Sequence, residues 1–376
     1  MRRFLPWAAL TGSTSVPFWL HDPYLLNAFI TTGIFIIAAM SLNLLLGYTG
    51  QLSLGHVAFF GIGAYTSALV SLGFNVELIF GLRVVHEPWP PLAGFVIAIA
   101  VSALCGYVVG KLSFKVRGAY FVIVSVSFAE VVRLVALNWV ELTQGPLALT
   151  SIPPMTLGLP GLGYLDFYSK ASYYWLVLGV LAVSYVVISR LVHSRTGRAM
   201  VALKENEPLA MSVGIDVTRY LVLAAVFSAG IAGAAGSLYA HYLKIIDPDV
   251  FAFLSTVTMV IMVVTGGKGT LAGPIVGGLV FGFVPVAARS LAAPEVQWIL
   301  YGVVMIVILF VLPRGIVPAI EKGLDGILQK SKLEKSKPDK LRPEQSKPDT
   351  SGLEKPRPEQ ATGDLAAVAV KLGDPP

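Results

Sequence analysis

The chain of 376 residues is 55% hydrophobic and only 13% charged, whereas a soluble globular protein carries about 25% charged residues, so most of this chain belongs in lipid. Its net charge of +6 comes with basic residues that flank apolar segments, a pattern typical of membrane topology signals rather than of nucleic-acid binding. The single cysteine, Cys105, excludes an intramolecular disulfide and a cysteine cluster for a metal ion.

Ten apolar segments are candidates for membrane-spanning helices. A helix crosses the hydrocarbon core with about 20 mostly apolar residues, because it satisfies its own backbone polar groups there. The first segment resembles a signal peptide but lacks a clean cleavage site, which favours an uncleaved span. We therefore predict an all-α, polytopic transmembrane helical bundle of about ten spans, with some short or broken helices. The candidates are residues 4–20, 24–46, 52–73, 91–110, 119–140, 172–191, 219–241, 251–266, 271–288 and 298–312.

Basic residues predict the orientation of these spans, because Lys and Arg in short loops stay preferentially in the cytoplasm. If the N-terminus lies inside, the inside loops before residue 321 contain twelve Lys and Arg residues, and the outside loops contain four. Both termini are therefore predicted to be cytoplasmic. Residues 321–376 are punctuated by proline and rich in both charges, so we predict a disordered cytoplasmic tail after a transmembrane domain of residues 1–320.

Two glycine-containing connections are too short to be ordinary loops. Residues 47–51 (Gly-Tyr-Thr-Gly-Gln) and 266–270 (Gly-Gly-Lys-Gly-Thr) each separate two apolar runs. Each favours either a broken or re-entrant helix or a tight turn at the membrane surface. Asn43, Gln51 and His56 surround the first connection, and a lone histidine there is more often a hydrogen-bonded packing residue than a ligand.

The sequence contains no constellation typical of an enzyme. Lys268 in the second connection is followed by glycine rather than by Ser or Thr, so the phosphate-binding pattern fails and we expect no nucleotide hydrolysis on this chain. The five histidines are scattered through loops and span ends, without a carboxylate or a nucleophile at a motif spacing.

Glu130 and Arg133 are charged residues within an otherwise apolar segment. Because they are three residues apart, they share one helix face and are expected to pair. Such a pair either lines the path of a solute or a proton, or locks neighbouring helices as an internal ion pair. Both interpretations stay open at the level of sequence.

Residues 193–218 form the largest predicted cytoplasmic loop before the tail. The loop is basic at its start and acidic further on, and apolar positions recur at helical intervals as far as Gly214. This pattern predicts one or two short amphipathic helices outside lipid, with an apolar side that needs burial on a partner protein or at lipid headgroups. A solvated connector is the alternative.

Ordered blocks of sequence between about residues 24 and 320 are distinctive enough to compare with known families. They are residues 42–56, residues 117–120 with Glu130, Arg133, 138–139 and 142–143, residues 195–207, 214–220, 229–236 with Tyr239, 266–274 and 313–315. Together these blocks resemble the LivM-type permeases of the branched-chain amino acid ABC importers.

The resemblance implies a bacterial inner-membrane permease that works with a LivH-like sister permease or a second copy, two cytoplasmic ATPase subunits and an extracytoplasmic solute-binding protein. ATP would be used by the partner subunits, so no cofactor and no enzymatic activity are expected on this chain. Leucine, isoleucine and valine are the expected solutes. The loop would couple transport to an ATPase through Arg195, Thr196, Gly197, Arg198, Glu205, Asn206, Glu207 and Gly214.

Other functions stay open beside this one. Related permeases resemble importers of urea and short amides, and a self-sufficient secondary transporter could use Glu130 as a proton carrier. A membrane scaffold without transport activity is a third alternative. The candidates for a solute path or an internal ion pair are Asn43, Gln51, His56, Glu130 and Arg133.

Overall fold

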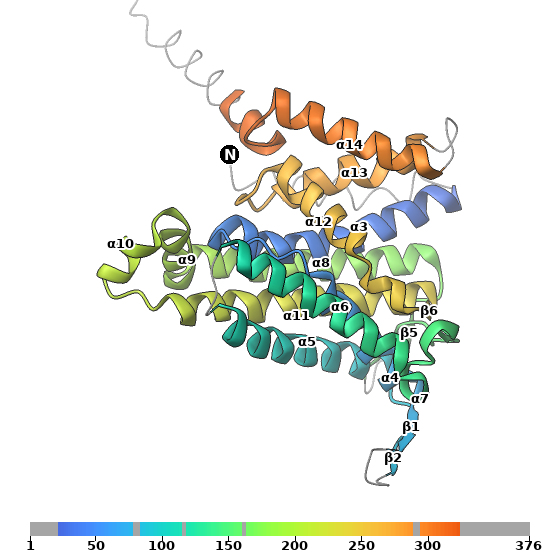
Figure 1. The fold of residues 1–376 in the computed structure, drawn as a ribbon. Coiled ribbons are helices and arrows are strands. Elements are labelled where there is room, and N and C mark those ends of the chain that lie inside the picture. Colours follow the sequence, from blue (N-terminus) through green and yellow to red (C-terminus); the bar gives the residue numbers. More distant parts are fainter. Residues whose placement is uncertain (1–21, 78–82, 115–117, 160–162, 289–293, 324–376) are drawn as a thin grey trace, which may run out of the picture. The chain divides into compact units, whose positions relative to one another are not determined.

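Long apolar helices dominate the structure, a computed structural model that describes residues 22–77, 83–114, 118–159, 163–288 and 294–323 (Figure 1). Five helical stretches in these ranges are long and apolar enough to cross a membrane. The predicted polytopic helical fold is therefore confirmed. The five are α3 (Pro23–Asn43) continued by the π-helix η1 (Leu44–Thr49), α5 (Pro91–Ser113), α6 (Ala119–Asn138), α8 (Lys170–His193) and α11 (Val217–Leu243).

Shorter apolar helices occupy the other predicted spans that the structure describes. The helix predicted to begin at residue 52 begins only at Val57, because the chain leaves helical geometry at Gly50, where φ is 76°. Residues 316–323 are also helical. The predicted first span at residues 4–20 and the predicted tail beyond residue 323 lie outside the described residues. The shorter helices are α4 (Val57–Leu72), α12 (Phe253–Gly266), α13 (Gly273–Ala288) and α14 (Pro294–Val311).

Short strands and helical turns form several of the connections. Strands β1 and β2 make an antiparallel hairpin, as do β4 and β5, whereas β3 pairs with β6 and so ties the segment after α6 to the segment after α11. Strands of this length carry too few residues for an alternating pattern, so the sequence did not predict them. These elements are β1 (Phe74–Glu77), β2 (Arg83–His86), α7 (Val140–Thr143), η2 (Gly145–Leu147), β3 (Leu149–Thr150), β4 (Thr156–Leu159), β5 (Gly163–Asp166), β6 (Ile245–Ile246) and η3 (Pro248–Phe251).

Glycines bring α4 and α11 into backbone contact at the centre of the bundle. A Cβ atom at Gly63 would overlap the backbone of Gly233, and one at Gly236 would overlap the carbonyl oxygen of Phe60. Helices in lipid gain little from the hydrophobic effect, so close van der Waals packing of small residues is a main source of their association. Helices α3 and α5 pack against this pair and complete the core.

We expect Gly63→Val to destabilise the bundle. The added side chain would push α4 away from α11, and overpacking of a tight core costs about 1–3 kcal/mol of unfolding free energy. Thermal unfolding of the purified chain in detergent measures the loss. Gly302→Val in α14 is the matched control, because a Cβ atom there meets nothing within 4 Å. Equal unfolding temperatures for the two variants would contradict the proposed packing constraint.

Candidate functional site

Two short helices, α9 (Arg195–Glu205) and α10 (Glu207–Ser212), fill the predicted cytoplasmic loop. Each helix begins at a capping side chain, which satisfies a backbone N–H that lacks an intrahelical partner. Ser194 Oγ accepts from the Gly197 amide at 3.3 Å, and Asn206 Oδ1 accepts from the Leu209 amide at 3.0 Å. Asn206 also ends α9, so this residue sets the corner between the two helices.

One side of α9 is buried against the rest of the chain. Met200 is fully buried, Leu203 is 5% exposed, and a Cβ atom at Gly197 would overlap the backbone of Val192. Arg195 and Arg198 of the same helix are exposed. Helix α9 therefore has the amphipathic character that its sequence pattern predicts, with its apolar side packed on its own bundle.

Helix α10 and the turn after it carry apolar side chains that are not buried. Leu209, Met211 and Val213 are 62%, 43% and 70% exposed, and we call these three residues the α10 patch. The helix ends at Ser212, and the turn after it contains Gly214, whose φ of 84° lies in the left-handed region that favours glycine. Figure 1 shows α9 and α10 together at one end of the long helices, with β1 and β2 at the other. The α10 patch is thus an apolar surface at an end of the bundle.

The two glycine-rich connections meet at Asn43. Its Nδ2 donates to the carbonyl oxygen of Thr270 at 2.8 Å, and its Oδ1 accepts from the amide of Gly269 at 2.9 Å. Asn43 is 2% exposed, and a Cβ atom at Gly47 would overlap both Asn43 and the Gly269 backbone. The sequence singled out both connections and Asn43, but it had no signal that would pair them.

Lys204 links α9 to both connections. A Cβ atom at Gly50 would lie 3.3 Å from Lys204 Cγ, and one at Gly269 would lie 3.4 Å from Lys204 Nζ. Lys204 was not among the predicted site residues, although its place in the amphipathic loop was visible. Helix α9 therefore packs on η1, with Lys204 near both connections.

His56 and Gln51 have surroundings different from those of Asn43. His56 is fully buried, with Nε2 2.7 Å from Ser41 Oγ, and Ser228 Oγ donates to the Ser41 carbonyl oxygen. The backbone amide of Gln51 donates to the carbonyl oxygen of Leu45 at 3.2 Å, which closes the end of η1. His56, at the start of α4, is thus joined to α3 through Ser41, and Ser41 is joined in turn to α11.

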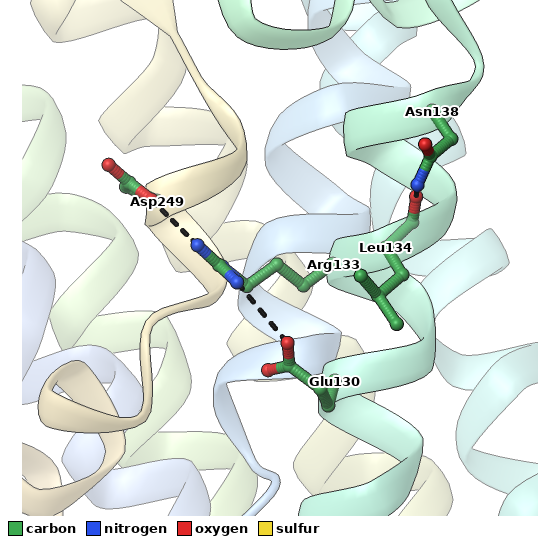
Figure 2. A network of polar contacts seen from close by, with 5 residues as sticks. All are labelled: Glu130, Arg133, Leu134, Asn138 and Asp249. Carbon is green, nitrogen blue, oxygen red and sulfur yellow. Dashed lines mark hydrogen bonds and ion pairs between the residues drawn. The ribbon is translucent and has the colours of Figure 1, made fainter.

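Arg133 forms two ion pairs, one within α6 and one with η3 (Figure 2). Its Nη1 lies 3.2 Å from Glu130 Oε1, and its Nη2 lies 3.2 Å from Asp249 Oδ1. The side chains of Arg133, Glu130 and Asp249 are 31%, 55% and 77% exposed, respectively. We call these residues the charged triad. Asp249 was missed, because it lies 116 positions beyond Arg133 and no sequence spacing relates the two.

The structure thus has the features of a polytopic permease, with long spanning helices, interrupted helices held together by a buried amide, and charged side chains on one helix face. The chain belongs to the family described as the branched-chain amino acid transport system permease component, which matches residues 24–309.

Relatives with this description extend over most of the chain. The high-affinity branched-chain amino acid transport system permease protein LivM of Salmonella typhimurium is 33% identical over 76% of this chain and 68% of that protein. LivH of Escherichia coli is 25% identical over 77% of this chain and 93% of its own. A probable LivM of Methanocaldococcus jannaschii is 26% identical over 76% of this chain and 91% of that protein. No solved structure matches the chain.

Asn43→Ala should loosen the junction between the two connections. It leaves the Gly269 amide and the Thr270 carbonyl without their side-chain partner, and an unsatisfied buried polar group costs about 1–3 kcal/mol. Hydrogen exchange should become faster at the Gly269 amide, and the unfolding temperature should fall. Asn138→Ala is the control, because the Asn138 amide is exposed and donates only within its own helix, to the Leu134 carbonyl. Unchanged exchange at Gly269 would argue against the junction.

Proposed function

We propose that this chain is the membrane-spanning permease subunit of an ATP-driven importer in a bacterial inner membrane. We propose leucine, isoleucine and valine as its solutes, on the support of relatives named as branched-chain amino acid permeases. The observation that carries the ATP-driven part is the exposed α10 patch, which follows the exposed bases of the preceding helix α9. An apolar surface rimmed by charge is typical of a protein docking site.

The partners in this proposal are a LivH-like sister permease or a second copy, two cytoplasmic ATPase subunits and an extracytoplasmic solute-binding protein. ATP is hydrolysed on the ATPase subunits, so this chain needs no cofactor of its own. The loop of residues 193–218 docks on an ATPase, and its end of the bundle faces the cytoplasm. The coupling residues are Arg195, Thr196, Gly197, Arg198, Glu205, Asn206, Glu207 and Gly214.

The contacts of Lys204 suggest how docking reaches the transport path. This side chain lies near both interrupted connections, and Asn43 holds those connections to each other. A displacement of α9 by an ATPase would therefore move η1 and the connection between α12 and α13 together. Interrupted helices are suited to such movement, because fewer intrahelical bonds resist it.

The charged triad is our candidate for the solute path. An amino acid carries one ammonium and one carboxylate group, and the triad offers carboxylates and a guanidinium as complements. Partly exposed ion pairs contribute about 0–1 kcal/mol to stability, so an internal lock would gain little from this arrangement. An importer of uncharged urea or amides has no need of both charges, which favours an amino-acid solute.

The transport assay for this proposal uses proteoliposomes that contain the chain, its sister subunit and the ATPases, with the binding protein added outside. We expect radiolabelled leucine uptake that requires ATP. Uptake driven by a proton gradient without ATPases would contradict the proposal and favour a secondary transporter. Urea uptake without leucine uptake would replace the proposed solute class.

In the same assay, Leu209→Asp and Val213→Asp should abolish coupling. A charge in a desolvated docking surface is costly, and loss of a central contact weakens association at least about tenfold. ATPase co-purification and leucine uptake should fall together, while the unfolding temperature of the exposed variants stays constant. Val85→Asp on β2 is the control, since Val85 is 64% exposed and Val213 is 70% exposed. Normal co-purification of the α10 variants would contradict the docking assignment.

Glu130→Gln separates a solute path from an internal lock. We expect uptake at least about tenfold slower, because the solute loses one charged contact. The unfolding free energy should stay within about 1 kcal/mol of the wild type. Glu141→Gln is the control, because Glu141 is an exposed carboxylate on α7 outside the triad. Poor assembly with a normal uptake rate per assembled complex would favour the lock.

A further inference from the structure

A deep apolar groove lies between α5, α8 and α11. Its volume is about 700 Å³, within the range of about 300–1,000 Å³ that is usual for ligand sites. Its walls are almost wholly hydrocarbon. Among the residues that line it are Ile99 and Ala103 from α5, Val180 and Val183 from α8, and Phe227 and Gly230 from α11.

The groove adjoins a second cavity that contains two basic residues. This second cavity has a volume of about 610 Å³ and includes Lys111 at the end of α5 and Arg219 at the start of α11. Val226 and Phe227 line both cavities, so the two are neighbours along α11.

Helix α5 provides a continuous wall to both cavities. Phe95, Ile99, Ala103, Tyr107 and Lys111 follow one another at intervals of four residues, and each lines one of the two cavities. Residues four apart are neighbours on a helix surface, and each step of four turns by about 40°, so this row winds around α5. Because Val226 and Phe227 line both cavities, one furrow runs along the bundle from an apolar end to a basic end.

The basic end has two positive charges that form no ion pair with other residues in the described ranges. Lys111 and Arg219 are both exposed, and neither forms an ion pair with another residue in the described ranges. Lys111 Nζ lies 5.7 Å from the centre of the Tyr107 ring. Asp216 also lines this cavity, but its Oδ1 caps α11 by accepting from the Arg219 amide at 3.1 Å. The two bases exceed this one acid, so the end of the furrow favours an anion.

We infer that the furrow binds an anionic phospholipid, with its phosphate at Lys111 and Arg219 and an acyl chain along Tyr107, Ala103 and Phe227. The length of the furrow agrees with the thickness of one lipid leaflet, because Ile99 and Lys111 are about 18 Å apart along α5 at 1.5 Å per residue. One leaflet contributes about 15 Å of the hydrocarbon thickness of about 30 Å. Basic pockets between spanning helices at the cytoplasmic side are suited to anionic headgroups.

The membrane leaflet in which the bound lipid lies depends on the proposed orientation of the chain, whereas lipid binding itself does not. The basic end is the end that carries α9 and α10, since α11 starts five positions after Ser212, the last residue of α10. A cytoplasmic docking loop therefore places the lipid in the cytoplasmic leaflet. Lipid binding is measured without transport, so a failure of this inference is distinguishable from a failure of the proposed function.

The test is native mass spectrometry of the purified full chain, titrated with palmitoyl-oleoyl phosphatidylglycerol. We expect one lipid retained with an affinity at least about tenfold above that for phosphatidylcholine, since the charged headgroup contacts account for the difference. Inorganic phosphate should not displace the lipid, because the acyl chain contributes to binding. Equal affinity for the two lipids, or displacement by phosphate alone, would overturn the inference.

Two variants examine the two ends of the furrow. Lys111→Gln combined with Arg219→Gln removes the headgroup charges, and Val183→Trp fills the apolar part at a residue that is 63% exposed. Both should reduce phosphatidylglycerol retention at least about tenfold, with unchanged unfolding temperatures.

Matched controls are Lys268→Gln, which removes an exposed base outside the furrow, and Ile123→Trp, since Ile123 is a 62% exposed residue of α6. Retention by the variants equal to that of their controls would overturn the inference. So would a loss of dimers with Val183→Trp at constant lipid retention, because a second copy would then be the occupant of the groove.

Discussion

The two hydrogen bonds of Asn43 are the interaction on which the arrangement of the bundle depends. Where a spanning helix is interrupted, its backbone groups lose their partners, and hydrocarbon offers none. One amide side chain has both a donor and an acceptor, so Asn43 satisfies a carbonyl and an N–H of the other connection at once. The result joins η1 to the segment between α12 and α13, near Lys204 of α9.

Polar groups inside the bundle differ from those on its surface. Ser41 bonds to His56 and accepts from Ser228, and Ser67 bonds to both Ser237 and His241, all buried between α3, α4 and α11. These hydrogen bonds hold helices that glycines have brought together. The charged triad on α6 and η3 is partly exposed, so its groups have room for further partners.

The exposed surfaces of the chain also divide by chemistry. The α10 patch is apolar and follows a helix with exposed arginines at the end of the bundle, where an apolar surface calls for a protein partner. The groove between α5, α8 and α11 is apolar along the spanning helices, where lipid is the natural solvent. Its basic end distinguishes it from an ordinary lipid-facing surface, because a headgroup charge has a complement there.

The sequence by itself determined the features that depend on neighbouring residues. Length and apolar composition predicted the spanning helices, glycines marked both interruptions, and a spacing of three residues placed Glu130 and Arg133 on one face. The sequence did not predict the short strands, because strands of two to four residues are too short to show an alternating pattern. Only the tertiary structure paired Asn43 with Gly269, Arg133 with Asp249, and Tyr107 and Lys111 with Arg219 across one furrow. These contacts join residues up to 226 positions apart, and they follow from how the helices cross, which close packing of the whole bundle decides and no local pattern encodes.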